Sequence, residues 1–128
     1  MNTTSLQQQN REIVAEVMAA VFVRREPQNV MHLFSDQYIQ HNPQIPNGKE
    51  AIPALIEALP EGFSYQPGML VAEKDLVMIH GRYIGWTSRP MVAVDIFRLE
   101  AGKLVEHWDV LQEEVPAQQS VNGNAMFP

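Results

Sequence analysis

The sequence has no cysteine, so it can form neither a disulfide bond nor a thiolate metal site. It also lacks a basic cluster: the net charge is -6, and the densest basic pair is Arg24-Arg25. Nucleic acids and anionic membranes are therefore poor candidates as partners. No apolar run approaches the roughly 18 residues of a membrane span, and residues 1–9 contain no apolar signal core. These absences predict a soluble, cytoplasmic protein.

Length and composition favour one globular domain. The chain has 128 residues, of which 45% are hydrophobic, and this suits a single domain with its own core over residues 1–128. Residues 1–9 are polar, and we expect them to be flexible. Residues 113–128 are polar and contain proline, which predicts a C-terminal tail. Its final Ala125-Met126-Phe127 is able to dock as an apolar latch.

The first half of the chain has helical periodicity. Apolar residues between positions 5 and 25 recur every three to four residues, which predicts an amphipathic helix with a cap among residues 3–5. Pro27 suits the first turn of a second, short helix, followed by a short extended piece at 38–41. A loop or lid rich in proline and glycine then leads to a third helix at 49–59.

From Phe63 onward the pattern is typical of strands. The four runs cover residues 63–72, 76–86, 91–99 and 103–111. Three helices followed by a four-stranded antiparallel meander form an α+β domain. A helix layer covers one face of such a sheet, yet both faces of the last two runs are mainly apolar. We therefore expect the second face to meet another copy of the protein in a homodimer.

The last two runs flank Glu100-Ala101-Gly102, which predicts a β-hairpin with a three-residue loop. In this register Asp95 lies opposite His107. Strand alternation places Asp95, His107 and Asp109 on one face, and a slip of two residues would change the partners but keep the face. Because both faces are mainly apolar, these polar groups must pair with each other, with water or with a ligand.

Several motifs resemble the SnoaL-like (polyketide cyclase-like) branch of the nuclear transport factor 2-like superfamily. They are Tyr38-Ile39-Gln40-His41-Asn42-Pro43, His80-Gly81-Arg82 and the closing string Gly102-Lys103-Leu104-Val105-Glu106-His107-Trp108-Asp109-Val110. The resemblance runs from about residue 10 to the end of the chain. It implies a cone-shaped, cystatin-like α+β fold with three N-terminal helices packed on a curved antiparallel sheet. Members of the superfamily fill this cone with different chemistry, so the fold alone does not select a function.

In the enzymes of this branch, the resemblance implies cofactor-free proton transfer by a carboxylate or a His-Asp pair inside the cone. Polyketide cyclases use an aspartate acid/base beside a histidine, and Asp95 and Asp109 both match that place. The resulting catalytic residues are Asp95 as the base, His107 as its partner and His80 as a donor to the developing oxyanion. The substrate-binding residues are Tyr38, His41, Asp109, Arg82 and Trp86. Tyr38 or His41 is an alternative oxyanion donor, and Arg82 suits an anionic substrate group.

Proton abstraction next to a carbonyl needs a base whose pKa approaches the working pH, and an apolar pocket raises the pKa of a carboxyl group in that direction. The first hypothesis is therefore cofactor-independent acid/base catalysis on a small hydrophobic carbonyl compound. The reaction would be an aldol condensation or cyclisation, an isomerisation or a dehydration.

Three alternatives remain open. Asp95 and His107 could form a structural ion pair without chemistry. The protein could bind a small hydrophobic ligand without turnover, or act as a dimeric scaffold. His41, His80 and His107 with one aspartate are residue types that bind zinc or iron, but no paired-histidine spacing supports such a site. We therefore expect neither a metal nor a cofactor.

Overall fold

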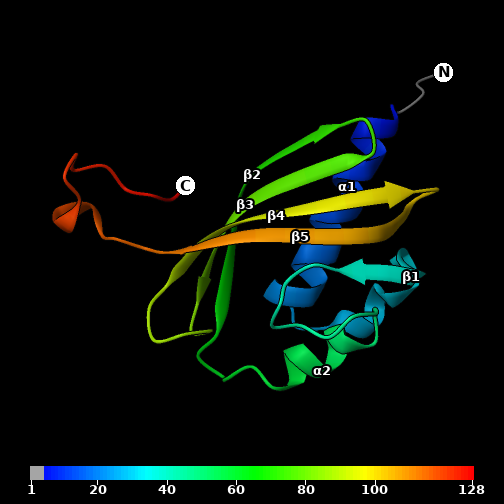
Figure 1. The fold of residues 1–128 in the computed structure, drawn as a ribbon, viewed down its shortest axis with the longest axis horizontal. Helices are drawn as coiled ribbons and strands as arrows, with labels where there is room; N and C mark the ends of the chain where they lie inside the picture. Colours follow the sequence, from blue (N-terminus) through cyan, green and yellow to red (C-terminus); the bar gives the residue numbers. More distant parts are fainter. Residues whose placement is uncertain (1–4) are drawn as a thin grey trace.

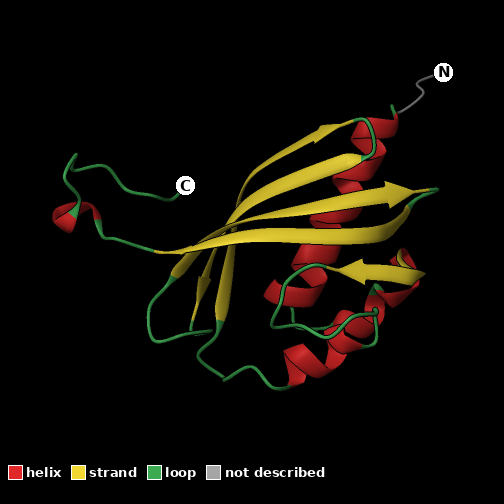
Figure 2. Ribbon diagram, in the orientation of Figure 1, coloured by secondary structure: helices red, strands yellow, loops and turns green. Residues whose placement is uncertain are grey.

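The computed structural model describes residues 5–128 as a curved sheet with the helices on one of its faces (Figures 1 and 2). The helical elements are α1 (Leu6–Met18), continued by a π-helical turn (Ala19–Val23), two 3-10 turns (Pro27–Asn29 and Met31–Leu33) and α2 (Ala51–Glu57). The strands are β1 (Phe34–Gln40), β2 (Ser64–Glu73), β3 (Leu76–Ile84), β4 (Met91–Glu100) and β5 (Lys103–Glu113). The predicted α+β class is confirmed. Within this part of the chain, none of the helices combines the length and apolar character needed to cross a membrane.

The helices differ from the prediction in number and at their ends. Ser5 caps α1, because its Oγ accepts a hydrogen bond from the backbone N–H of Gln8 at 3.1 Å. Residues 6–9, predicted to be flexible, form the first turns of α1, whereas residues 1–4 of that prediction lie outside the described part of the chain. The second of the three predicted helices is replaced by two 3-10 turns, because Val30 between them has a non-helical φ of -126°.

The sheet has the strand order β1-β5-β4-β3-β2. Strands β2 to β5 form the predicted antiparallel meander, and β1 adds a fifth strand that runs parallel to β5. The sequence predicted only a short extended piece here, because the polar run Ser35-Asp36-Gln37 obscures the strand pattern. The parallel pairing places Gln40 beside His107 and so brings the end of β1 to the middle of the last hairpin.

The β4–β5 hairpin has a shorter turn than predicted. Only Ala101 and Gly102 form it, and both have positive φ values, 50° and 78°, as a type I′ turn requires. The shorter turn shifts the register by one residue, and the β-bulge or irregularity between Arg98 and Leu99 shifts it by one more. Asp95 therefore pairs with Asp109, and the predicted pairing of Asp95 with His107 is wrong by two residues. Because side chains alternate with a period of two, the three polar residues still share one face.

One face of the sheet packs against the helices and is called the inner face below. The core lies between this face and α1. Val14 and Val17 of α1 and Val77 and Ile79 of β3 are almost fully buried there. Full burial of such a side chain contributes roughly 1.5–3 kcal/mol. The opposite, outer face of the sheet carries the alternate residues of the same strands, such as Met78.

The C-terminal tail extends away from the sheet after β5, forms a 3-10 turn (Ala117–Gln119) and then turns back (Figure 1). The Phe127 ring reaches the outer face and lies 5.4 Å from the ring of His80, measured between centroids. A Cβ atom on Gly68 would lie 2.8 Å from the Phe127 ring, so this glycine permits the close approach. The end of the tail therefore docks on the sheet, as the sequence indicated.

Candidate active site

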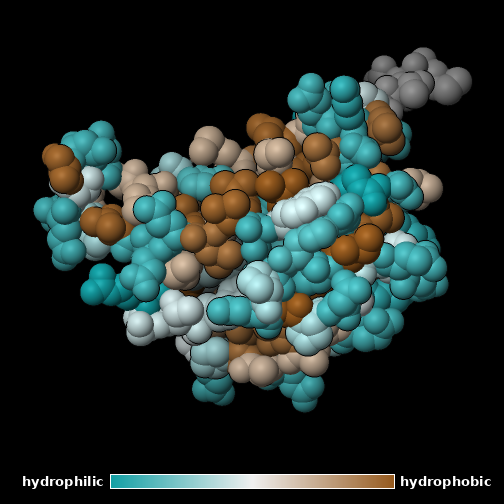
Figure 3. Space-filling model, viewed as in Figure 1, coloured by the Kyte–Doolittle hydropathy of each residue, from teal (hydrophilic) through white to brown (hydrophobic). Residues whose placement is uncertain are grey.

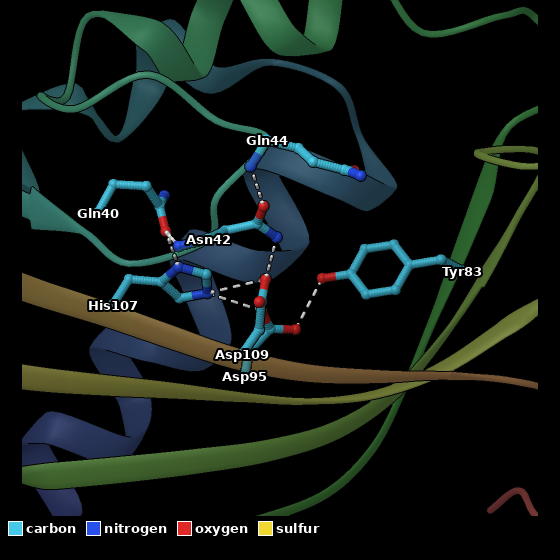
Figure 4. Close-up of polar contacts among 7 residues, drawn as sticks. All are labelled: Gln40, Asn42, Gln44, Tyr83, Asp95, His107 and Asp109. Atoms are coloured by element: carbon cyan, nitrogen blue, oxygen red, sulfur yellow. Dashed lines mark hydrogen bonds and ion pairs between the residues drawn. The ribbon is translucent and has the colours of Figure 1, made fainter.

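Four polar side chains meet on the inner face of the sheet (Figure 4). Tyr83 extends from β3, Asp95 from β4, and His107 and Asp109 from β5. They lie on adjacent strands at positions of the same alternation, so all four point toward the helices. Asp95 and His107 are only 3% and 6% exposed. Polar groups buried to this extent require hydrogen-bond partners.

Both carboxylate oxygens of Asp95 are engaged. The Oδ1 atom lies 2.7 Å from His107 Nε2, and the Oδ2 atom accepts a hydrogen bond from the Tyr83 hydroxyl at 2.8 Å. Burial, together with the negative charge of Asp95, raises the pKa of Tyr83 well above its ordinary value, so the phenol stays protonated and donates. Asp95 is thus held by two protein partners rather than presented to a ligand.

Asp109 is in a different situation. Its Oδ2 accepts a hydrogen bond from Asn42 Nδ2 at 2.8 Å and lies 3.9 Å from His107 Nε2. Within residues 5–128 no donor contacts its Oδ1. Burial raises the pKa of the Asp109 carboxyl group; Asn42 and His107 oppose this shift, and the charge of Asp95 adds to it. A carboxylate with a raised pKa and one free oxygen is suited to accept a proton.

The cluster lies between two spaces. The inner space is a cavity of about 30 Å³ walled by apolar side chains of the helices and by this cluster, which is room for one or two water molecules. The second space is a wider hollow of about 330 Å³ beside Asn42, Pro43 and Gln44. It is called the outer hollow below and is distinct from the outer face of the sheet. Asp109 and Trp86 line both spaces. Among the described residues that line them there is no lysine or arginine.

Two predicted site residues, His80 and Arg82, lie on the outer face, so their predicted place in the cone is wrong. In the β3–β4 register Ile79 is the partner of Asp95, and alternation then turns His80 and Arg82 away from the cavity. The Arg82 Nε atom donates to Glu114 Oε1 at 2.7 Å instead of facing a ligand. Neither residue is placed to contact a substrate in the cavity.

The other predicted binding residues divide in the same way. Tyr38 and Trp86 line the inner cavity, where the sequence placed them. His41 does not: its ring stacks on Trp108 at 4.9 Å, and its Nε2 lies 2.6 Å from Glu106 Oε2. His41 therefore belongs to the outer side of β5, and its predicted place as an oxyanion donor is wrong.

The sequence reasoning missed two residues of the site, Gln40 and Asn42. Gln40 Oε1 lies 2.6 Å from His107 Nδ1, and Asn42 holds Asp109 as described above. A signal was present, because Tyr38, Gln40 and Asn42 occupy alternate positions and alternate positions of a strand share a face. The polar run at 35–37 hides this alternation, because it removes the apolar pattern by which a strand is identified.

Among the residues that the structure describes, this cluster also brings together three side chains that could hold a metal. Asp95, His107 and Asp109 each offer one ligand atom, and these atoms all lie within 4.8 Å of one another. Carboxylate and imidazole ligands of this kind suit zinc or iron. The histidine set weighed from the sequence is not assembled, because His41 and His80 lie on the other side of the sheet.

Solved structures of similar fold support this architecture. TsrD from Streptomyces laurentii is 23% identical, with a TM-score of 0.69, and the match covers 84% of this chain and 92% of TsrD. An NTF2-like protein of unknown function from Mesorhizobium loti is 20% identical, with a TM-score of 0.70 and coverage of 87% and 97%. A protein provisionally described as a SnoaL-like polyketide cyclase from Jannaschia sp. CCS1 is 19% identical, with a TM-score of 0.69 and coverage of 88% and 91%. At these identities the likeness establishes the fold alone.

Sequence comparison with curated proteins finds no match. The family model of the SnoaL-like domain, in contrast, matches residues 14–107. This range extends from the buried face of α1 to His107 and covers most of the chain. The protein therefore belongs to the SnoaL-like domain family, as its closing β-strand motif and helix-first organisation had indicated.

Proposed function

We propose that the protein catalyses cofactor-independent proton transfer on a small, uncharged, hydrophobic carbonyl compound, in an aldol or cyclisation, isomerisation or dehydration reaction. One observation carries this proposal: Asp109 has a carboxylate oxygen without a donor among residues 5–128, a pKa raised by burial and a place between the cavity and the outer hollow. An uncharged substrate is expected because two aspartates and no lysine or arginine line these spaces.

In the proposed reaction, Asp109 Oδ1 takes a proton from the carbon next to the carbonyl group. The electron pair of the broken C–H bond moves into the carbonyl group and forms an enolate, whose oxygen needs a hydrogen-bond donor. The substrate lies in the outer hollow, because the inner cavity has room for only one or two water molecules. Tyr38 is the proposed donor, acting through such a water, because it lines the inner cavity and because burial raises the pKa of its phenol and keeps it protonated. His107 stabilises the ionised form of Asp109, whereas the charge of the buried Asp95 opposes it and so favours uptake of the proton.

This assignment moves the role of base from Asp95 to Asp109. The sequence left the two aspartates unresolved and placed Asp95 first. The contacts favour Asp109, because both Asp95 oxygens already have protein partners. Asp95 is then a residue that orients His107.

Deuterium exchange into simple ketones tests the proposal. Cyclohexanone and 2-tetralone are incubated with the protein in D₂O, and loss of the α-proton signal is followed by NMR. Wild-type protein should accelerate exchange of at least one ketone, and Asp109→Asn should reduce the rate by about 10²–10⁴-fold. Asp75→Asn, a matched change at an exposed turn, should leave the rate unchanged. Ketone binding, detected by line broadening, without any exchange would contradict catalysis and support the alternative of a ligand-binding protein.

We also propose that the outer face of the sheet pairs two copies of the chain in a homodimer in the cytoplasm. Large apolar side chains are exposed there, including Met69, Val71 and Val110, the last at 67%. Figure 3 displays this face, with apolar side chains gathered over the strands. Exposed patches of this kind favour association.

Sedimentation velocity tests the dimer. Val110→Glu should convert it to a monomer, because an unpaired carboxylate would be buried at the interface. Val23→Glu is the matched control, since Val23 is also exposed but lies at the end of the N-terminal helix. A monomeric wild-type protein, or a dimer that survives Val110→Glu, would contradict the proposal.

A further inference from the structure

Gln40, which has no role in the reaction proposed above, makes a contact that fixes a proton in the site. It is the last residue of β1 and the register partner of His107. Its Oε1 atom lies 2.6 Å from His107 Nδ1 and 3.0 Å from the backbone nitrogen of Asn42. One side-chain atom of Gln40 therefore faces two nitrogens at once (Figure 4).

The backbone N–H of Asn42 determines which end of the Gln40 amide this atom is. A backbone N–H can only donate, so the atom that faces it must be the amide oxygen and not the NH₂ group. The same oxygen faces His107 Nδ1, and an oxygen can only accept. His107 Nδ1 must therefore carry a hydrogen.

The other ring nitrogen has a different set of neighbours. His107 Nε2 lies 2.7 Å from Asp95 Oδ1 and 3.9 Å from Asp109 Oδ2, and both are carboxylate oxygens. With a hydrogen on Nδ1, Nε2 is the ring nitrogen that faces both carboxylates.

The same short segment also sets the position of the base. Asn42 donates its backbone N–H to Gln40 and its side-chain Nδ2 hydrogen to Asp109 Oδ2 at 2.8 Å, and its Oδ1 accepts from the backbone of Gln44 at 2.8 Å. The loop after β1 is therefore joined to both His107 and Asp109.

We propose that Gln40 is a positioning residue, which holds the imidazole of His107 with its proton on Nδ1 so that Nε2 faces the two aspartates. This inference rests on the proposed function for its catalytic consequence, but the protonation of the ring can be measured without any activity. Gln40 acts through His107 and does not itself exchange protons with the substrate.

Long-range ¹H–¹⁵N NMR of the histidine side chains in wild-type protein tests the inference directly. His107 is assigned by the signal that disappears in His107→Gln. At every pH at which the protein is folded, His107 should have a protonated Nδ1. A neutral His107 ring with a bare Nδ1 would overturn the inference, whatever the outcome of the exchange assay.

Two substitutions at Gln40 test whether its contact with His107 affects the ring tautomer and the reaction rate. Gln40→Leu removes the acceptor and should produce a mixture of ring tautomers, with a 10- to 100-fold lower kcat for ketone exchange and an unchanged KM, as for other groups that orient an imidazole. Gln40→Glu retains an acceptor and should keep Nδ1 protonated, while its charge shifts the pH profile of the reaction upward. Gln37→Leu, on the exposed side of the same strand, is the matched control.

The outcomes are separable. If Gln40→Leu leaves the tautomer, the kcat and the pH profile as in wild type, Gln40 has no positioning role. If wild-type protein catalyses no exchange but the NMR spectra follow the expectation, the proposed function fails and the assignment of the proton stands. If Gln40→Leu does not fold, the wild-type spectrum and Gln40→Glu still decide the question.

Discussion

The two faces of the sheet carry the same residue types but place them in opposite environments. His107 on the inner face has both ring nitrogens beside acceptors, Gln40 and Asp95. His80 on the outer face packs against Phe127, and its buried Nδ1 has no partner within residues 5–128. His80 and His107 each lie in a motif that resembles the family, so the motifs do not distinguish a site residue from a surface residue. Strand alternation does, because it turns His107 toward the cavity and His80 away from it.

Two acidic residues of β5 extend the comparison. Glu106 is on the outer side, where hydrogen bonds from His41 and Arg98 lower the pKa of its carboxyl group. Asp109 is three residues further along and faces inward, where burial raises the pKa of its carboxyl group. A carboxylate with a lowered pKa stays ionised and serves an ion pair, whereas one with a raised pKa can exchange a proton nearer neutral pH.

The largest difference between the faces should appear in the reaction rate. His107→Gln should reduce ketone deuterium exchange by about 10²–10⁴-fold, because it removes the imidazole beside the proposed base. His80→Gln, the matched change on the outer face, should leave the rate unchanged, since His80 points away from the cavity. NMR exchange rates measure both. Equal losses in the two variants would remove the distinction between the faces.

The second-largest difference between the two faces should be in their contribution to the free energy of unfolding. Ile79 is 2% exposed on the inner face, and Ile79→Ala should lower the free energy of unfolding by about 2–5 kcal/mol. Its neighbour Met78 is 37% exposed on the outer face, and Met78→Ala should change it by only about 0.5 kcal/mol in the monomer. Urea unfolding at several protein concentrations gives both values. A large, concentration-dependent loss for Met78→Ala would instead indicate that a dimer buries this position.

Substitutions of Asp109 and of Glu106 should change the Tm in opposite directions at pH 7. Because the folded-state pKa of Asp109 is raised, ionised Asp109 disfavours folding at pH 7, so Asp109→Asn should raise the Tm there. That gain should vanish below the ordinary pKa of 3.8. Because the folded-state pKa of Glu106 is lowered, Glu106→Gln should lower the Tm at pH 7, and the loss should disappear as the pH falls through that lowered pKa, below 4.5. Thermal unfolding from pH 3 to pH 8 distinguishes them, and shifts of the same sign would contradict the comparison.

The smallest effect belongs to an ion pair on the outer face. Arg82→Gln removes the contact with Glu114 and should cost about 0.2–1 kcal/mol of stability, less at high salt. Ketone exchange should not change. Urea unfolding at low and high ionic strength measures the cost, and a loss of exchange activity would return Arg82 to the substrate-binding role that the sequence suggested.

Local patterns were sufficient to group the polar residues of the last hairpin. The turn was predicted one residue too long and Asp95 was paired with the wrong residue, yet Asp95, His107 and Asp109 share a face as expected. A register error of two residues preserves the alternation of side chains. The placement of His80 failed for a related reason: residues 85–90 between β3 and β4 form a longer connection, which leaves the relative register of those strands undetermined by the sequence.

The sequence by itself determined the α+β class, the helix-first order and the face on which the acidic and histidine residues of β5 lie, because each of these depends on periodicity along a short segment. The tertiary structure decided which carboxylate keeps a free oxygen and which nitrogen of His107 faces it. Both depend on contacts of Gln40 and Asn42 with residues 67 positions away in the chain. Those contacts form only because β1 pairs in parallel with β5, and no local pattern encodes a pairing between such distant segments.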